Sequence, residues 1–161
     1  MVWTKINFIE TFLRFVTMLE LKGNIWDMWE IGKSIVIPIN LTLNTEGSLV
    51  MGAGLAKDTK ERIFGIDREL GETIRFFNLC ENNIMTLRGG KEFYFPTKVD
   101  WKKPSKLEYI ERALPSFLVL TSVCEEVYLP RLGCGLGGLR WEEVREVLQP
   151  KLDDRYIVLQ R

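Results

Sequence analysis

Histidine is absent from all 161 residues of the sequence. Histidine is the usual general base of serine and cysteine triads and the usual proton shuttle at neutral pH, so its absence excludes most hydrolase templates. The three cysteines, Cys80, Cys124 and Cys134, form no C-x-x-C pair, and no histidine can complete a common zinc set with them. We therefore expect no metal and no cofactor. Any chemistry must use lysine, carboxylates, water or main-chain groups.

A net charge is also absent, because 22 lysines and arginines balance 22 aspartates and glutamates. No global field draws the protein toward nucleic acid or an anionic membrane. The apolar stretch "FIETFLRFV" carries Glu10 and Arg14 and is too short to span a bilayer. The length suits one globular domain. We predict a cytoplasmic monomer without a membrane partner, with an amphipathic extension over residues 1–17 and one domain over residues 18–161.

Apolar runs alternate with amphipathic stretches along the chain. We predict buried strands within residues 17–24 and 34–40, further strands within 125–132 and 155–160, and a strand pair around a Gly89-Gly90 turn within residues 83–98. Helices are predicted within residues 51–65, 67–79, 104–114 and 140–148. We expect Gly65 to cap the first helix, Ser105 and Glu108 to form a capping box, and Pro115 to kink the third helix or start a new segment. The alternation predicts a three-layer α/β/α fold with a mixed, largely parallel central sheet.

Two glycine-rich stretches lie where predicted helices begin. "PRLGCGLGGLRW", from Pro130 to Trp141, places four glycines and a cysteine between a strand and a helix, and "VMGAGLAK" places Gly52 and Gly54 at a helix start. Ligands bind at the carboxyl ends of strands in open α/β sheets, where glycines let a phosphate approach main-chain N–H groups. Neither stretch fits the dinucleotide fingerprint or a P-loop. The two loops either grip a diphosphate from opposite sides or merely form tight turns.

The arrangement of these segments resembles a macrodomain, the ADP-ribose-binding module. The resemblance runs from about Leu19 to the C-terminus and rests on "LKGNIWD", "VIPIN", "VMGAGLAK" and "LPRLGCGLGGLRWEEV". The last of these stretches is similar to the branch of the family that contains the terminal ADP-ribose protein glycohydrolase and the DNA ADP-ribosyl glycohydrolase antitoxins. "FPTKVDWKKPSKLEYIE" looks like the antitoxin segment that carries a catalytic lysine. The resemblance thus implies that Lys98 is catalytic.

The resemblance also implies which residues contact ADP-ribose as ligand or product. These are Asn24, Ile25, Asn40, Met51, Gly52, Ala53, Gly54, Leu55, Thr97, Leu132, Gly133, Cys134, Gly135, Leu136 and Gly137. Asn24 stands where many members have an aspartate that accepts a hydrogen bond from the adenine amino group, and an amide oxygen can still accept it. Gly137 stands where the protein glycohydrolase branch has a catalytic aspartate. That departure brings this chain closer to the antitoxins.

Lys98 can act in two ways if it lies near the distal ribose. Its amine attacks the anomeric carbon, or it donates a hydrogen bond to the leaving group. The alternative is that Lys98 is one of several surface lysines. We expect a protein that binds ADP-ribose through the two loops and hydrolyses ADP-ribosyl linkages on a nucleobase or an acidic side chain of a macromolecule. A non-catalytic ADP-ribose reader and an ADP-ribose 1''-phosphate phosphatase are the alternatives.

The residues after Lys98 give one local hint of a nucleic-acid substrate. Lys102, Lys103 and Lys106 flank Trp101, and such a turn could meet phosphates and stack a base of ADP-ribosylated DNA, although solvated lysines are commoner. Asp100 could orient Lys98, but a turn residue is the simpler interpretation. Cys134 is interpreted as a small packing residue. Trp101 and Trp141 either flank the pocket or anchor the core.

Overall fold

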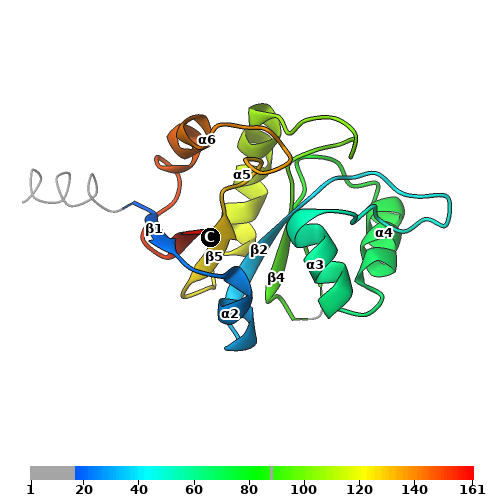
Figure 1. Cartoon of the computed structure of the whole chain (residues 1–161), viewed down its shortest axis with the longest axis horizontal. Coiled ribbons are helices and arrows are strands. Elements are labelled where there is room, and N and C mark those ends of the chain that lie inside the picture. Colours follow the sequence, from blue (N-terminus) through cyan, green and yellow to red (C-terminus); the bar gives the residue numbers. More distant parts are fainter. Residues whose placement is uncertain (1–16, 88) are drawn as a thin grey trace, which may run out of the picture.

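The computed structural model describes residues 17–87 and 89–161, which form a six-stranded sheet with helices on both faces (Figure 1). The strands are β1 (Leu19–Lys22), β2 (Ser34–Ile39), β3 (Met85–Thr86), β4 (Glu92–Pro96), β5 (Val127–Pro130) and β6 (Tyr156–Gln160). Their spatial order is β1-β6-β5-β2-β4-β3, and every neighbouring pair is parallel except β3 and β4. The predicted mixed, largely parallel sheet is confirmed. The predicted extension lies, apart from Thr17, outside the described residues.

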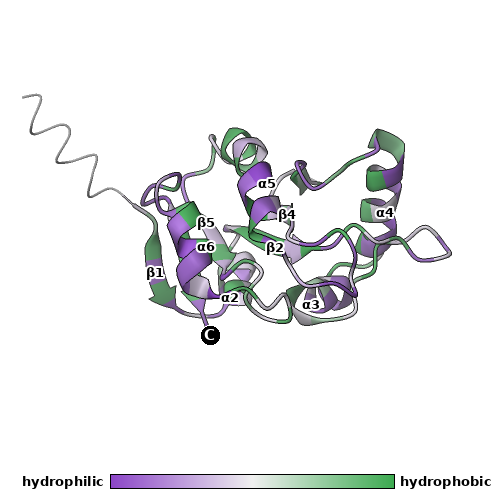
Figure 2. Ribbon diagram, turned by 90° about the horizontal axis from the view of Figure 1, so that it is seen from above, coloured by the Kyte–Doolittle hydropathy of each residue, from purple (hydrophilic) through white to green (hydrophobic). Residues whose placement is uncertain are grey.

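Five helices cover the sheet in the described part of the chain. They are α2 (Ile25–Glu30), α3 (Gly54–Arg62), α4 (Ile66–Phe77), α5 (Leu107–Leu120) and α6 (Trp141–Leu148). Residues of α5 and α6 pack in one hydrophobic cluster and residues of α2, α3 and α4 in another. Viewed from above, α5 lies on one side of the central strands and α2 and α3 on the other (Figure 2). The sheet thus lies between two layers of helices, which is the predicted three-layer α/β/α arrangement.

The central strands are buried on both faces, which is why nearly all of their residues are apolar. In β2, Ile35, Ile37 and Ile39 belong to the α2–α4 cluster, whereas Val36 belongs to the α5–α6 cluster. Successive side chains of a strand point to opposite faces, so one strand contributes to both cores. The edge strand β1 is different, because its Leu19 and Leu21 are exposed. The prediction that this strand is buried was wrong, because β1 is an edge strand: among residues 17–87 and 89–161 it pairs with β6 alone.

Two predicted helix boundaries differ in the structure. Helix α3 ends at Arg62, and Gly65, with a φ of +77°, directly precedes α4 instead of capping α3. Helix α5 begins at Leu107 with Lys106 as N-cap, so no capping box forms at Ser105. Ser105 is buried and its main-chain N–H donates to the carbonyl oxygen of Gly137. These tertiary contacts hold Ser105 outside the helix.

Pro115 lies inside α5 and starts no new segment. A proline leaves the carbonyl four residues earlier without its helical donor, which here is the carbonyl of Glu111. Both Glu111 and Pro115 are exposed, so water can serve that carbonyl. Leu114 and Phe117 are buried in the α5–α6 cluster and hold the helix against the sheet on either side of the proline.

No helix in residues 17–87 and 89–161 is long and apolar enough to cross a membrane. Within the same ranges, no three histidine, cysteine, aspartate or glutamate side chains cluster in a way that could hold a metal ion.

Candidate functional site

A cavity of about 910 Å³ opens at the carboxyl edge of the parallel strands. Five of the strands lead into segments that line it, and the strand order arranges those segments along the cavity. Residues next to β1 and β6 lie at one end, the loops after β5 and β2 lie in the middle, and the segment after β4 lies at the other end. The cavity therefore sits at the sheet edge where open α/β folds bind ligands.

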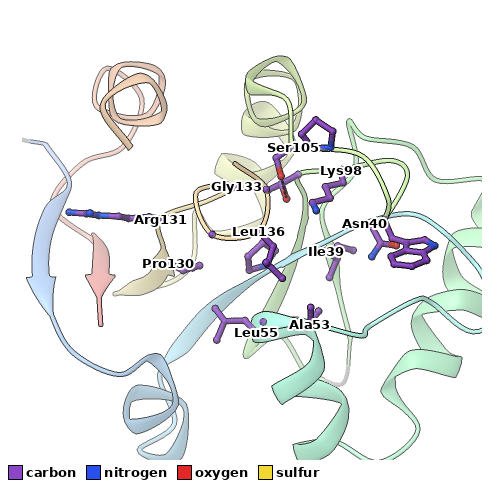
Figure 3. A pocket seen from close by; sticks show the side chains of 18 of the residues that line it. Ile39, Asn40, Ala53, Leu55, Lys98, Ser105, Pro130, Arg131, Gly133 and Leu136 are labelled. Carbon is purple, nitrogen blue, oxygen red and sulfur yellow. Dashed lines mark hydrogen bonds between the residues drawn. The ribbon is translucent and has the colours of Figure 1, made fainter. Parts of the chain in front are cut away.

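The structure brings most of the predicted site residues to this cavity. Those that line it are Ile25, Asn40, Gly52, Ala53, Gly54, Leu55, Thr97, Lys98, Gly133, Gly135, Leu136 and Gly137. Residues far apart in the sequence thus meet around one space, as Figure 3 shows for Asn40, Leu55, Lys98 and Leu136. Their contacts with a ligand remain a prediction.

Four predicted residues do not line the cavity. Met51 and Leu132 are buried in the hydrophobic clusters. Asn24 caps α2, and its side-chain oxygen accepts a 3.1 Å hydrogen bond from the Trp26 main chain. Cys134 packs against the α5–α6 cluster, and burial raises the pKa of its thiol. Neighbouring residues of one sequence motif therefore differ, since some face the cavity and others face the core.

The second glycine loop, residues 133–138, is closed by its own main chain and pinned by Ser105. Leu139 donates to the Gly133 carbonyl at 2.9 Å, and Ser105 donates to the Gly137 carbonyl at 2.9 Å. A β-carbon on Gly137 would lie 2.8 Å from the Ser105 β-carbon and would overlap the Ser105 hydroxyl and the Gly133 carbonyl oxygen. Only glycine fits at this position in the present arrangement, so an aspartate there is excluded by shape.

The first glycine loop, residues 50–54, is held by Asn40 at the end of β2. The Asn40 amide donates to the Val50 carbonyl at 2.7 Å, and its oxygen accepts from the Thr42 main chain at 2.9 Å. A β-carbon on Gly52 would meet no atom within 4 Å, and Gly54 has a φ of +55°. The loop therefore presents open backbone to the cavity next to the first turn of α3, where main-chain N–H groups lack helical partners.

Lys98 lies at the β4 end of the cavity on a fixed main chain. The Thr97 N–H donates to the Ile39 carbonyl at 3.0 Å, and the Val99 carbonyl accepts from Leu41 at 3.1 Å. The side chain is half-buried and lies between Leu136 and Asn40 in Figure 3. Within the described part of the chain, no carboxylate forms an ion pair with Lys98. Its amine is therefore available to a ligand.

The two tryptophans and Asp100 have separate roles. Trp141 is buried, and its ring nitrogen donates to Glu20 at 2.6 Å, so it anchors α6 to β1 away from the cavity. Trp101 lines the cavity and is 48% exposed. The Asp100 carboxylate accepts from the Lys102 main chain at 3.0 Å, which confirms its interpretation as a turn residue.

Sequence reasoning missed several lining residues. Pro130 and Arg131 at the end of β5, Leu159, Gln160 and Arg161 at the end of β6, and Ser105 before α5 all line the cavity. The strand-end positions carried a usable signal, because the carboxyl ends of parallel strands meet at one edge. Ser105 gave none, since its spacing to Glu108 favoured a helix cap.

The curated proteins that match this chain in sequence share one name. No family model matches the chain. A DNA ADP-ribosyl glycohydrolase of Thermus aquaticus is 40% identical over 137 residues, which cover 76% of this chain and 36% of the relative. A protein of the same name from Mycobacterium tuberculosis is 46% identical over 59 residues, 34% of this chain and 16% of the relative. The chain thus spans about a third or less of the curated relatives that it matches.

Solved structures show the same fold. The macrodomains of Mycobacterium tuberculosis DarG and of Thermus aquaticus DarG each superpose with a TM-score of 0.70 at 24% identity over 89% of this chain, and they are covered to 99% and 97%. A structure of Thermosipho africanus DarTG in complex with ADP-ribose superposes with a TM-score of 0.62 at 22% identity, over 79% of this chain and 37% of that one.

Proposed function

This chain is a macrodomain of the type found in DarG proteins, and on that premise we propose that it binds ADP-ribose and removes it from DNA. One observation carries the proposal: two glycine loops and an unpaired lysine from three different strand ends line the same cavity. The relatives named DNA ADP-ribosyl glycohydrolase and the ADP-ribose complex of Thermosipho africanus DarTG support the choice of ligand and substrate.

The strand order suggests how ADP-ribose lies in the cavity. The diphosphate would bind between the loops after β2 and β5, where glycine backbone is open at Gly52 and Gly135. The adenosine would point toward β1 and β6, where Ile25 and Leu159 offer apolar surface. The distal ribose would then reach the β4 end beside Lys98. This placement puts the anomeric carbon, which carries the linkage, next to Lys98.

Lys98 would act on that anomeric carbon. In the covalent route, the neutral amine forms a bond to the carbon, the bond to the base nitrogen breaks, and the base takes up the proton that the amine loses. Opening of the sugar ring then gives an iminium, and water attacks it to release ADP-ribose and free lysine. In the non-covalent route, Lys98 donates a hydrogen bond to the leaving base while water attacks. Both routes add one water across the glycosidic bond.

The shape of the second loop favours a second candidate, a reader that binds ADP-ribose without cleaving it. Gly137 supplies no carboxylate, and its close contact with Ser105 leaves no room for one. A mechanism that needs an acid at this position cannot operate here. Catalysis in this chain would therefore depend on Lys98 alone among the predicted catalytic groups.

The test combines calorimetry and turnover. We expect ADP-ribose to bind with measurable heat, and a single-stranded oligonucleotide carrying one ADP-ribosylated base to be cleaved. Lys98→Ala should abolish cleavage and keep ADP-ribose binding. Lys91→Ala is the matched control, because Lys91 is an exposed lysine at the opposite, amino end of β4. Borohydride reduction during turnover should attach ADP-ribose to Lys98 if the route is covalent.

Each outcome decides between the candidates. Binding without cleavage by the unaltered chain identifies a reader. Full cleavage by Lys98→Ala removes Lys98 from the mechanism. A calorimetric titration without heat from ADP-ribose overturns the proposal as a whole.

A further inference from the structure

The loop that follows β4, residues 97–106, forms a rim at one end of the cavity. Its two ends meet, because the Lys106 N–H donates to the Thr97 carbonyl. Inside it, the Lys103 N–H donates to the Asp100 carbonyl at 3.1 Å and the Lys102 N–H to the Asp100 carboxylate at 3.0 Å. The rim loop is therefore a compact turn with defined geometry.

Thr42 fastens this turn to the rest of the molecule. The Trp101 N–H donates to the Thr42 hydroxyl at 3.0 Å, and that hydroxyl donates to the Val99 carbonyl at 3.1 Å. Trp101 is thus placed by its backbone. Its ring packs into neither hydrophobic cluster and stays 48% exposed while lining the cavity. A large aromatic ring held in this way offers a stacking surface to a ligand.

One lysine lies against this ring, and a second follows it in the same turn. Lys102 and Lys103 both line the cavity and are exposed, and the Lys102 ammonium lies 5.6 Å from the centre of the Trp101 ring. Neither lysine forms an ion pair with a carboxylate of residues 17–87 or 89–161. Other lysines are used differently, since Lys33 and Lys60 pair with carboxylates at 3.0 and 3.1 Å. The rim combines an exposed aromatic ring with unpaired positive charge.

The strand order places this rim where the substrate leaves the cavity. If ADP-ribose lies along the sheet edge as proposed above, its distal ribose is at the β4 end, and whatever is attached to that ribose must pass the rim loop. A protein substrate would need no aromatic stacking surface there. A nucleic acid uses both features, because its bases stack on aromatic rings and its phosphates attract unpaired lysines.

We infer that the rim loop is a DNA-binding element, in which Trp101 stacks on a base that neighbours the ADP-ribosylated one and Lys102 and Lys103 contact the flanking phosphates. The inference rests on the proposed function and adds which residues of this chain would hold the DNA strand beside the modified base. Stacking on Trp101 requires that the base beside the modified one is unpaired. A modified nucleoside alone leaves the rim empty.

The test compares two substrates that share the same linkage, an ADP-ribosylated base within a single-stranded oligonucleotide and the same ADP-ribosylated base as a nucleoside. Binding of each is measured by competition against ADP-ribose, and cleavage is measured as kcat/KM. We expect the oligonucleotide to be preferred by about tenfold or more. Trp101→Ala should remove that preference and leave the nucleoside and free ADP-ribose unaffected. Phe76→Ala is the matched control, since Phe76 is an aromatic side chain on α4 that is 82% exposed.

The lysines have a separate readout in the salt dependence. Replacing both Lys102 and Lys103 by alanine should lower the slope of log affinity against log salt by about 1.4, or about 0.7 for each lysine, for the oligonucleotide only. Lys91→Ala with Lys151→Ala is the control for loss of two exposed lysines away from the cavity.

Failure of the inference can be told from failure of the proposed function. Equal affinity for nucleoside and oligonucleotide, or equal losses on both in Trp101→Ala, overturns the DNA-binding rim while the function stands. Preference for an ADP-ribosylated acidic peptide over the oligonucleotide also overturns it. If ADP-ribose itself does not bind, both fall together. The competition assay keeps the comparison valid for a chain that binds without cleaving.

Discussion

The main-chain N–H of Ser105 donates a 2.9 Å hydrogen bond to the carbonyl oxygen of Gly137, and the Ser105 side chain fills the space that a β-carbon of residue 137 would need. Ser105 also donates its hydroxyl to Thr97 at 3.3 Å. This chain of contacts joins the second glycine loop to the segment that carries Lys98. The two halves of the site are therefore set relative to each other by one small buried residue.

Gly137→Ala is expected to destabilise the fold, because the added methyl group must push Ser105 and the Gly133 carbonyl apart. Overpacking of this kind costs about 1–3 kcal/mol. Urea unfolding measures the loss, and calorimetry should show weaker ADP-ribose binding as the loop shifts. Gly135→Ala is the matched control for the unfolding measurement, since a β-carbon there meets no atom within 4 Å. Equal stability of the two variants would show that the contact with Ser105 is looser than described.

Gly52→Val is expected to separate binding from folding. A β-carbon on Gly52 has no neighbour within 4 Å and the residue lines the cavity, so the added side chain enters free space. We expect a free energy of unfolding within about 0.5 kcal/mol of the unaltered chain. ADP-ribose affinity should fall at least about tenfold, with a smaller loss for Gly52→Ala. Undiminished affinity in the valine variant would place the diphosphate elsewhere.

Asn40→Ala should loosen the first glycine loop, because it removes the donor to Val50 and the acceptor from Thr42. Leaving these main-chain groups unpaired costs about 1–3 kcal/mol each when they are buried, and less where water reaches them. Chemical denaturation and calorimetry should both show losses. Asn83→Ala is the control, because Asn83 accepts from the Cys80 main chain in a loop away from the cavity. An Asn40→Ala protein with unchanged ADP-ribose affinity would argue against this positioning role.

Cys134 is expected to react more slowly than Cys80 with an alkylating reagent. The thiolate is the reactive form, and burial raises the pKa of the Cys134 thiol, so less thiolate exists at any pH below that pKa. Cys80 is exposed. Mass spectrometry after timed iodoacetamide treatment should show Cys80 modified first, and the Cys134 rate should still rise with pH above about 8.5, the ordinary pKa of cysteine. Faster modification of Cys134 would mean that the loop amides favour its thiolate.

Much of the fold was predictable because its signals are local. The apolar runs of β2, β4, β5 and β6 are continuous, as expected for strands buried on both faces, and amphipathic helices alternate with them. The Gly89-Gly90 turn between β3 and β4 was recognisable for the same reason, and both glycines have positive φ. The exposure of β1 was not predictable from its own residues, because its edge position depends on where β6 lies.

The candidate site was predictable only in part. The glycine loops and Lys98 stand out in the sequence, and the structure gathers them at one cavity. Met51 and Leu132 were included because they belong to the same motifs, yet their side chains face the core. Ser105 was predicted to cap a helix and instead supports the second loop. A motif identifies a segment, whereas the direction of each side chain depends on what packs around that segment.

The sequence by itself determined the class of the fold, the two glycine loops and the absence of histidine chemistry, because each of these follows from residue types and their spacing along the chain. Tertiary structure alone decided that the loops after β2 and β5 are neighbours, that the rim loop lies at the far end of the cavity, and that residue 137 has no room for a side chain. The physical reason is that strand order and close packing join residues that are distant in the chain, and no local pattern encodes those contacts.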